Sequence, residues 1–470
     1  MFKSIQRISI KRVVLITITQ LIFNINANQL EIKPLDLKPT TSTPKKCIKD
    51  WNFMVYITSN NNLYNDSINN IIQMMKVGSN KNLNILIQQD TYGKNEIARY
   101  YIEKERANLM QLEKDSPASI SGTPQNLYDF AEWAVTNYPA KKHALILWNH
   151  GSGIEDPSIW GKKDSQYSNQ IFSINSQTGL LELNRKSKKD RGIAFNEVFE
   201  TYITNQELRK TLHKIKSDLL RGNKIDILGM DACHMAMFEI GTQIKKDAKY
   251  MVGSEEVEPG SGWNYTTVLK PFTNKTLTPK EFAINIVKAY GKQYSTSYAD
   301  HTQSAVDLEK FSELESCLNK ISSFLINLLN QSNNTKIIEL LKKIRTSDKL
   351  TTIFDNKNYV DHKHFYQSLL SESKKLDSKI YTEFKIDSLQ NLLLKGIETI
   401  NQTIIANTSG PNLPKASGLS FYYPKKKIHS SYPKTIFAQK TKWIEFLKKY
   451  IKLTRNNKNI DKLEKPEKIS

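Results

Sequence analysis

Cysteine is scarce in this sequence, which has only Cys47, Cys233 and Cys317 in 470 residues. Three thiols allow at most one disulfide, so the fold cannot depend on the disulfide framework that stabilises many small secreted domains. Cys47 and Cys317 could pair or stay free. If they pair, Cys233 is left as the odd thiol, which in an exported chain is a flag for reactivity.

Short motifs of several enzyme classes are also missing. The eight histidines form no HExxH and no zinc-spaced cluster with cysteine, which argues against a metal site. No GxSxG elbow lies between an expected strand and helix, which argues against a serine hydrolase of that type. No EF-hand loop is present, so the sequence identifies no calcium ligands.

Long apolar runs are confined to the N-terminus. Four basic residues precede an apolar run from Val13 to Ile25, and Asn26 and Ala27 follow it. This pattern predicts a secretory signal peptide over residues 1–27, because the run is short for a membrane span. An uncleaved signal anchor is the alternative. We therefore expect export to the periplasm, the cell surface or the medium, with no membrane span after signal removal.

Acidic residues are outnumbered, with 47 Asp and Glu against 68 Lys and Arg and a net charge of +21. The lysines are spread along the chain rather than gathered beside aromatic residues, which favours solvated faces over nucleic-acid binding. A basic protein that binds envelope polymers or nucleic acid is the alternative.

From Trp51 onwards, apolar runs of strand length alternate with amphipathic segments. WNFMVYITS, LNILIQQD and ALILW are expected strands, with helices over 62–75 and from Pro124 to Tyr138 between them. The first helix should turn one apolar stripe towards the core, made of Ile68, Ile71, Ile72 and Met75. Such alternation predicts an α/β fold with a mostly parallel central sheet.

The expected domain boundaries follow changes in composition. A loop over 152–201 is too long for an ordinary βα connection and is predicted to be functional or processed. The remaining segments are a linker over 28–50, a catalytic domain over 51–310, a helical subdomain over 311–410, a returning strand and helix over 411–453 and a disordered tail over 454–470.

Two of the predicted strands end in residues that carry chemistry. ALILW leads to His150, and IDILGMD leads to Cys233. Parallel strands end at the same edge of a sheet, and a thiol beside an imidazole is the minimal pair for an activated cysteine nucleophile. A helix starting directly after Cys233 would favour the thiolate, and the N–H groups of Gly151 and Cys233 are natural oxyanion donors. Either residue alone would more often be structural.

Six segments, in order along the chain, are WNFMVYITSNNNL, NYPAKKHALILWNHGSG, RGIAFNEVFETYITNQEL, DILGMDACHMAMFEI, GSEEVEPGSGWNY and GLSFYYP. Together they resemble the clostripain family of cysteine peptidases, and the Ala-Cys pair resembles the wider group of caspases, legumains and gingipains. The resemblance implies a caspase-like αβα sandwich. It also implies His150 and Cys233 as a catalytic dyad that cleaves after Arg or Lys through a thioester.

The resemblance further implies a pocket for a basic side chain. Asp231 matches the acid that lines this pocket in the family, and a buried carboxylate is the physical partner of a guanidinium or ammonium group. Its alternative role is to cap the next helix. Glu258 and its neighbouring glutamates could add acid, whereas Ser261 stands where some relatives carry a further acid. Asn149 stands where many relatives have Asp.

Family members can be activated by cleavage of the loop between histidine and cysteine, and some depend on calcium. The basic residues that offer a self-cleavage site here are Arg185, Lys186, Lys188, Lys189 and Arg191. We therefore predict a secreted, monomeric cysteine endopeptidase that acts on proteins or peptides, requires no cofactor and has no nucleic-acid partner. The alternatives are an inactive caspase-like binding module and the basic binding protein described above.

Overall fold

The computed structural model describes residues 47–154, 172–174, 181–183 and 192–456. The predicted signal peptide, the basic cleavage cluster and most of the predicted tail lie outside these residues. All described residues belong to one compact unit, residues 43–470. Among the helices described, none has the length and apolar character needed to cross a bilayer.

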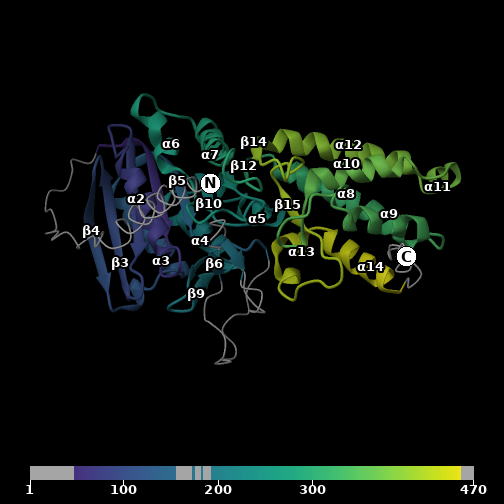
Figure 1. The fold of residues 1–470 in the computed structure, drawn as a ribbon, viewed down its shortest axis with the longest axis horizontal. Helices are drawn as coiled ribbons and strands as arrows, with labels where there is room; N and C mark the ends of the chain where they lie inside the picture. The colour runs from purple at the N-terminus through teal and green to yellow at the C-terminus, as the bar shows by residue number, and fades with distance from the viewer. Residues whose placement is uncertain (1–46, 155–171, 175–180, 184–191, 457–470) are drawn as a thin grey trace, which may run out of the picture. The chain divides into compact units, whose positions relative to one another are not determined.

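A nine-stranded sheet in the order β14-β12-β11-β10-β5-β1-β2-β3-β4 forms the centre of this unit (Figure 1). Strands β2, β1, β5, β10 and β11 run parallel, and the strands beyond them on both sides are antiparallel. The predicted α/β fold with a largely parallel sheet is thereby confirmed. The strands are β1 Lys49–Ile57, β2 Leu83–Asp90, β3 Glu96–Glu103, β4 Arg106–Lys114, β5 Ala140–Trp148, β10 Ile225–Asp231, β11 Ala248–Gly253, β12 Thr302–Asp307 and β14 Ile404–Ser409.

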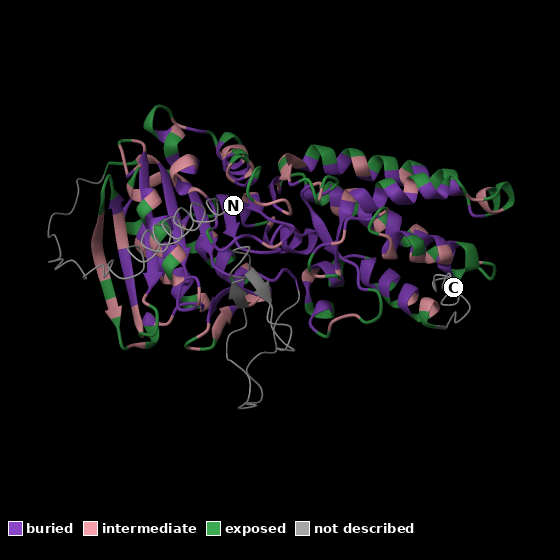
Figure 2. Ribbon diagram, viewed as in Figure 1, coloured by how far each residue is buried: buried purple, intermediate pink, exposed green. Residues whose placement is uncertain are grey.

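Two hydrophobic cores lie on opposite faces of the sheet, because side chains along a strand alternate between faces. In β1, Phe53 and Val55 belong to one core and Met54 and Tyr56 to the other. The first core is covered by α2 Tyr64–Met75, α6 Tyr265–Leu269 and α7 Pro279–Tyr294. The second is covered by α3 Pro124–Asn137, α4 Asn205–Lys214 and α5 Phe238–Ile244. Figure 2 shows the central strands buried between these layers.

Helix α2 differs from its predicted orientation. Ile71 is buried as expected, but Ile72 is 41% exposed and Asn70 is buried in its place. The reason is a hydrogen bond, in which the indole Nε1 of Trp148 donates to Asn70 Oδ1 over 2.8 Å. A satisfied buried amide therefore decides which face of the helix meets the sheet.

Two small hairpins lie within and at the end of the predicted long loop, among its described residues. These are β6 Phe172–Ile174 with β7 Leu181–Leu183, and β8 Ile193–Asn196 with β9 Thr201–Ile203. Strand β8 lies beside the segment that follows β5, because Gly151 forms an isolated antiparallel bridge with Ile193. The end of the loop thus lies beside the residue that follows His150.

The helical part after β12 also contains strands. Its helices are α8 Phe311–Asn330, α9 Thr335–Thr346, α10 His362–Ser373, α11 Ser378–Glu383 and α12 Ile386–Thr403, followed near the C-terminus by α13 Ile436–Lys440 and α14 Trp443–Asn456. Segment 411–453 is predicted to return a strand to the catalytic domain, but the sheet edge beside β12 is occupied by β14. Its strand β15, Ser420–Tyr422, instead pairs with β13, Tyr359–Asp361, in a separate two-stranded sheet.

Candidate active site

Three neighbouring strands bring Asn62, His150 and Cys233 to the same sheet edge. Strand β5 pairs on one side with β1 and on the other with β10, and Trp148 aligns with both Ile57 and Asp231. His150 and Cys233 each lie two residues beyond such an aligned position. The structure therefore places the two predicted catalytic residues at adjacent strand ends, as parallel pairing requires.

His150 is fully buried, and its Nε2 lies 2.7 Å from Asn62 Oδ1. This contact defines the tautomer of the ring, because the nitrogen facing an amide oxygen must carry the hydrogen, so Nε2 is the donor. Burial lowers the pKa of His150 to about 3. The imidazole is therefore neutral at ordinary pH, which is the form that can accept a proton.

Cys233 is also buried, with 3% of its surface exposed, and its Sγ accepts the backbone N–H of Glu258 over 3.2 Å. Burial, followed by the charges of nearby carboxylates, raises the pKa of the thiol. The expectation of a helix directly after Cys233 is wrong, because α5 begins only at Phe238. The intervening residues form a turn in which His234 has a φ of +60°. No helix N-terminus therefore assists thiolate formation here.

Gly151 allows the two predicted catalytic segments to touch. A Cβ atom on this residue would lie 2.5 Å from the Cys233 carbonyl oxygen and 2.9 Å from the Ala232 side chain. No side chain fits at such distances, so glycine is needed for close approach rather than for an unusual φ. The predicted oxyanion donors, Gly151 and Cys233, thus belong to segments in direct contact.

Asn149 fastens the strand end before His150 to strand β8. Its Oδ1 accepts the N–H of Phe195 over 2.6 Å, and its Nδ2 donates to the Phe195 carbonyl over 3.1 Å and to the Thr58 carbonyl. An aspartate could accept the first bond but could donate neither of the others. These contacts explain why an amide suits position 149 of this chain.

Asp231 is buried beneath the segment that follows Glu258. Its Oδ2 accepts the N–H of Trp263 over 3.1 Å and the hydroxyl of Tyr265 over 2.7 Å. It does not cap α5, whose N-cap is Met237, so the alternative role predicted for it is wrong. Burial raises the pKa of Asp231 to about 6, and its carboxyl group hydrogen-bonds that of Glu258.

Of the three neighbouring glutamates, Glu255, Glu256 and Glu258, only Glu258 contacts the Asp231 carboxyl group. Glu256 accepts the N–H of Asp355 over 2.9 Å, and Glu255 accepts the N–H of Gly418 over 2.7 Å. Both therefore anchor the helical part rather than the Asp231 site. Ser261 is exposed and lies 2.9 Å from the hydroxyl of Tyr294, oxygen to oxygen.

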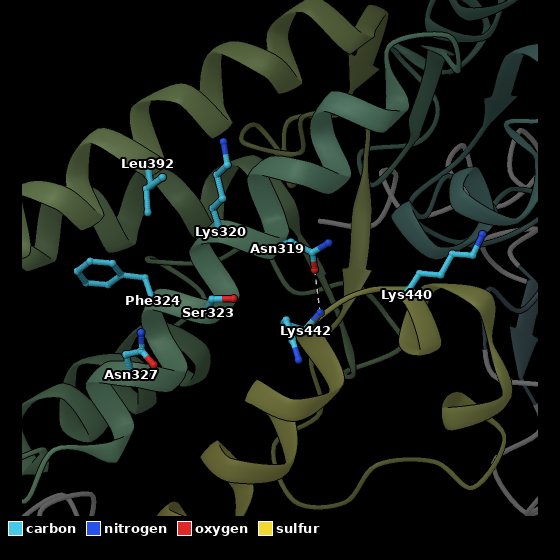
Figure 3. Close-up of a pocket in the computed structure, with 8 residues that line it drawn as sticks. All are labelled: Asn319, Lys320, Ser323, Phe324, Asn327, Leu392, Lys440 and Lys442. Carbon is cyan, nitrogen blue, oxygen red and sulfur yellow. Dashed lines mark hydrogen bonds between the residues drawn. The ribbon is translucent and has the colours of Figure 1, made fainter.

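The described residues offer no cluster of three or more His, Cys, Asp and Glu side chains that could hold a metal ion. All three cysteines are free, with Cys47 exposed and Cys317 half-buried. A groove of about 600 Å³ lies elsewhere, between α8, α12 and the segment joining α13 to α14 (Figure 3). It is lined by Asn319, Lys320, Ser323, Phe324, Asn327, Leu392, Lys440 and Lys442. None of these is a predicted site residue.

Asn62 is the residue that the sequence interpretation missed. It lies in the run Ser59-Asn60-Asn61-Asn62, which begins two residues after the end of β1 and in which three consecutive amides look equivalent. The only signal available was its place at the carboxyl edge of a predicted strand. Its side chain is distinguished by the contact with His150, which depends on the pairing of β1 with β5.

In the peptidase reaction predicted from the sequence, replacing Asn62 by alanine should lower kcat by about ten- to a hundredfold, since a lost buried acceptor costs about 1–3 kcal/mol. Asn62→Asp keeps an acceptor and adds a negative charge, so it should retain more activity and raise the pKa of His150. Steady-state kinetics from pH 5 to 9 would measure both effects. Equal loss in the two variants would contradict an orienting role for the amide oxygen.

The fold is shared with solved cysteine proteases. A secreted C11 cysteine protease from Bacteroides thetaiotaomicron in complex with an irreversible peptide inhibitor is 15% identical, with a TM-score of 0.53 over 86% of this chain and 99% of that chain. A further structure of a secreted C11 protease from that organism, iotapain, is 14% identical, with a TM-score of 0.57 over 84% and 99%. An inactive zymogen C11 protease from Parabacteroides distasonis is 14% identical, with a TM-score of 0.54 over 85% and 99%.

The chain belongs to the clostripain family, whose sequence model matches residues 55–176 and 174–450. Clostripain of Hathewaya histolytica is 22% identical over 464 residues, covering 86% of this chain and 81% of that protein. The predicted family is thereby confirmed.

Proposed function

We propose that this protein is an exported cysteine endopeptidase that cleaves after Arg or Lys, with Cys233 as nucleophile and His150 as general base and acid. The observation that carries the proposal is the convergence of Asn62, His150 and Cys233 at adjacent strand ends. Membership of the clostripain family supports the reaction class. The signal pattern over 1–27 supports export, as do the secreted relatives.

In the proposed reaction, the Cys233 thiol transfers its proton to neutral His150 as Sγ attacks the scissile carbonyl carbon. The resulting oxyanion accepts hydrogen bonds from the N–H groups of Gly151 and Cys233. His150 then gives the proton to the leaving amine, the C–N bond breaks and a thioester remains. Water, deprotonated by His150, hydrolyses the thioester and restores the thiol.

A basic substrate side chain would pair with Asp231. This carboxyl group lies two residues before the nucleophile and shares hydrogen bonding with Glu258, whose N–H reaches the Cys233 sulfur. Two adjacent carboxyl groups in a buried site repel when both are ionised, so a cation between them is favoured. Glu258 would therefore serve two roles: its carboxyl group would help to bind the substrate cation, and its backbone N–H holds the Cys233 sulfur.

Self-processing is the second part of the proposal. His150 and Cys233 are both buried, which supports a rearrangement before a peptide reaches them. The proposed cuts are at Arg185, Lys186, Lys188, Lys189 or Arg191, which lie outside the described residues. Calcium remains a candidate activator with no ligands assigned.

The proposal is tested with fluorogenic peptides ending in Arg, Lys, Asp or Asn, using residues 28–470 before and after trypsin nicking, with and without calcium. We expect Arg and Lys peptides to be preferred by about 100-fold or more, because an unpaired buried charge costs a few kcal/mol. Preference for Asp or Asn would contradict the assignment of Asp231. No turnover under any condition would favour the inactive binding module, while salt-sensitive binding to polyanions would favour the basic binding protein.

A further inference from the structure

The two-stranded sheet of β13 and β15 lies against the segments that follow both proposed catalytic residues. On the cysteine side, Ser420 donates its N–H to the Ala236 carbonyl over 3.0 Å, and Met237 forms a parallel bridge with Ser420. On the histidine side, the Tyr359 hydroxyl donates to the Ser152 carbonyl over 2.7 Å. A sheet that includes part of the helical region thus contacts both catalytic segments.

Tyr359 itself touches both segments. Its hydroxyl holds the backbone two residues after His150, and its ring lies edge-on to the ring of His234 at 5.5 Å between centroids. The side chain is fully buried. The contact with the histidine segment is close, because a Cβ on Gly153 would lie 2.7 Å from the Tyr359 ring.

The contact between Tyr359 and His234 bears on the position of Cys233, because His234 is the next residue along the chain. It directly follows Cys233 and adopts a φ of +60°, a conformation that a non-glycine residue keeps only when its surroundings enforce it. Its N–H donates to the Glu256 carbonyl over 3.2 Å, and its Nδ1 lies 3.0 Å from the Glu255 carbonyl oxygen. The Tyr359 ring packs edge-on against this imidazole.

We propose that Tyr359 is a positioning residue that sets the spacing between the His150 and Cys233 segments, so that the helical region completes the active site. This inference rests on the proposed function, because it assigns a role within the same dyad. The hydroxyl restrains the histidine segment and the ring restrains the cysteine segment. Ordinary core packing would require the ring but not the hydroxyl.

The test compares Tyr359→Phe with the matched control Tyr366→Phe. Tyr366 is an equally buried tyrosine on α10 whose hydroxyl has no hydrogen-bond partner among the described residues. We expect Tyr359→Phe to lower kcat by about tenfold with KM within about twofold, since a buried carbonyl loses its donor. Tyr366→Phe should retain wild-type kcat, and both variants should unfold at similar temperatures.

A second readout does not require peptide turnover. The rate of Cys233 alkylation by iodoacetamide is measured from pH 5 to 9 by peptide mass spectrometry, with exposed Cys47 as the internal reference. We expect slower alkylation and a shifted pH profile in Tyr359→Phe only. Identical profiles and kcat values in the two variants would overturn the proposal. Should the wild type cleave no peptide, the proposed function fails while the alkylation profiles still decide the role of Tyr359.

Discussion

Replacing Cys233 by alanine should reduce kcat/KM on Arg and Lys peptides by about 10⁴-fold or more, as expected when the nucleophile of a catalytic unit is removed. Without the sulfur no thioester can form, and the neutral His150 has no thiol to deprotonate. The matched control is Cys317→Ser. That residue lies on α8, 3.5 Å from the Thr399 hydroxyl, and should be replaceable with little effect.

The same pair of variants tests self-processing on denaturing gels. Wild type and Cys317→Ser should accumulate fragments cut within 152–201, and Cys233→Ala should stay intact. The fragments should co-elute under native conditions, because Ser152 and Asn149 bond to Gly192 and Phe195 on the far side of the predicted cuts. Unchanged turnover in Cys233→Ala, or equal loss in both variants, would contradict the assignment of the nucleophile.

Asp231→Asn should reduce kcat/KM for Lys and Arg peptides by about 100-fold while affecting a peptide with a neutral terminal residue far less. The neutral amide keeps the shape of the carboxylate but leaves a desolvated substrate cation without its counter-charge, which costs about 2–5 kcal/mol. Tyr265→Phe is the control for the anchoring role of Asp231, because it removes one donor to Oδ2 and leaves the charge. It should keep the preference for basic residues.

The pH dependence of this preference follows from the Asp231 carboxyl group. Burial raises its pKa to about 6, so the group is neutral below that pH and ionised above it. The ratio of kcat/KM for a Lys peptide to that for a neutral peptide should therefore rise between pH 5 and 7 and then level off. In the Asp231→Asn variant, this ratio should not change with pH. A ratio that does not change with pH in the wild type would contradict ion pairing by Asp231.

The sequence sufficed for those features that local patterns determine. Apolar runs ending at His150 and Cys233 revealed two strand ends, and parallel pairing then required their proximity. The rotation of α2 could not be predicted in the same way. Ile72 looks like a core residue by spacing, but the hydrogen bond from Trp148 to Asn70 turns the helix, and that bond exists only in the folded sheet.

Long-range contacts account for the rest of what the sequence did not reveal. Asn62 could not be chosen from its neighbouring amides, since only the position of His150 distinguishes it. Tyr359 lies in the helical region and contacts Ser152, which is 207 residues away along the chain. Residues 420–422 look like a strand from their sequence. The local pattern does not reveal that this strand pairs with β13 and not with the central sheet.

Covalent trapping tests the central claim most directly. The secreted-length protein is incubated with a peptidyl acyloxymethyl ketone ending in Lys, and the modified residue is located by mass spectrometry. If Cys233 is the nucleophile and Asp231 binds the basic side chain, each chain should carry one adduct, on Cys233. The amount of this adduct should be strongly reduced in the Asp231→Asn variant. It should also be strongly reduced when the reagent ends in Asp. An adduct on Cys47 or Cys317, or equal labelling by the Lys-ended and Asp-ended reagents, would contradict this assignment.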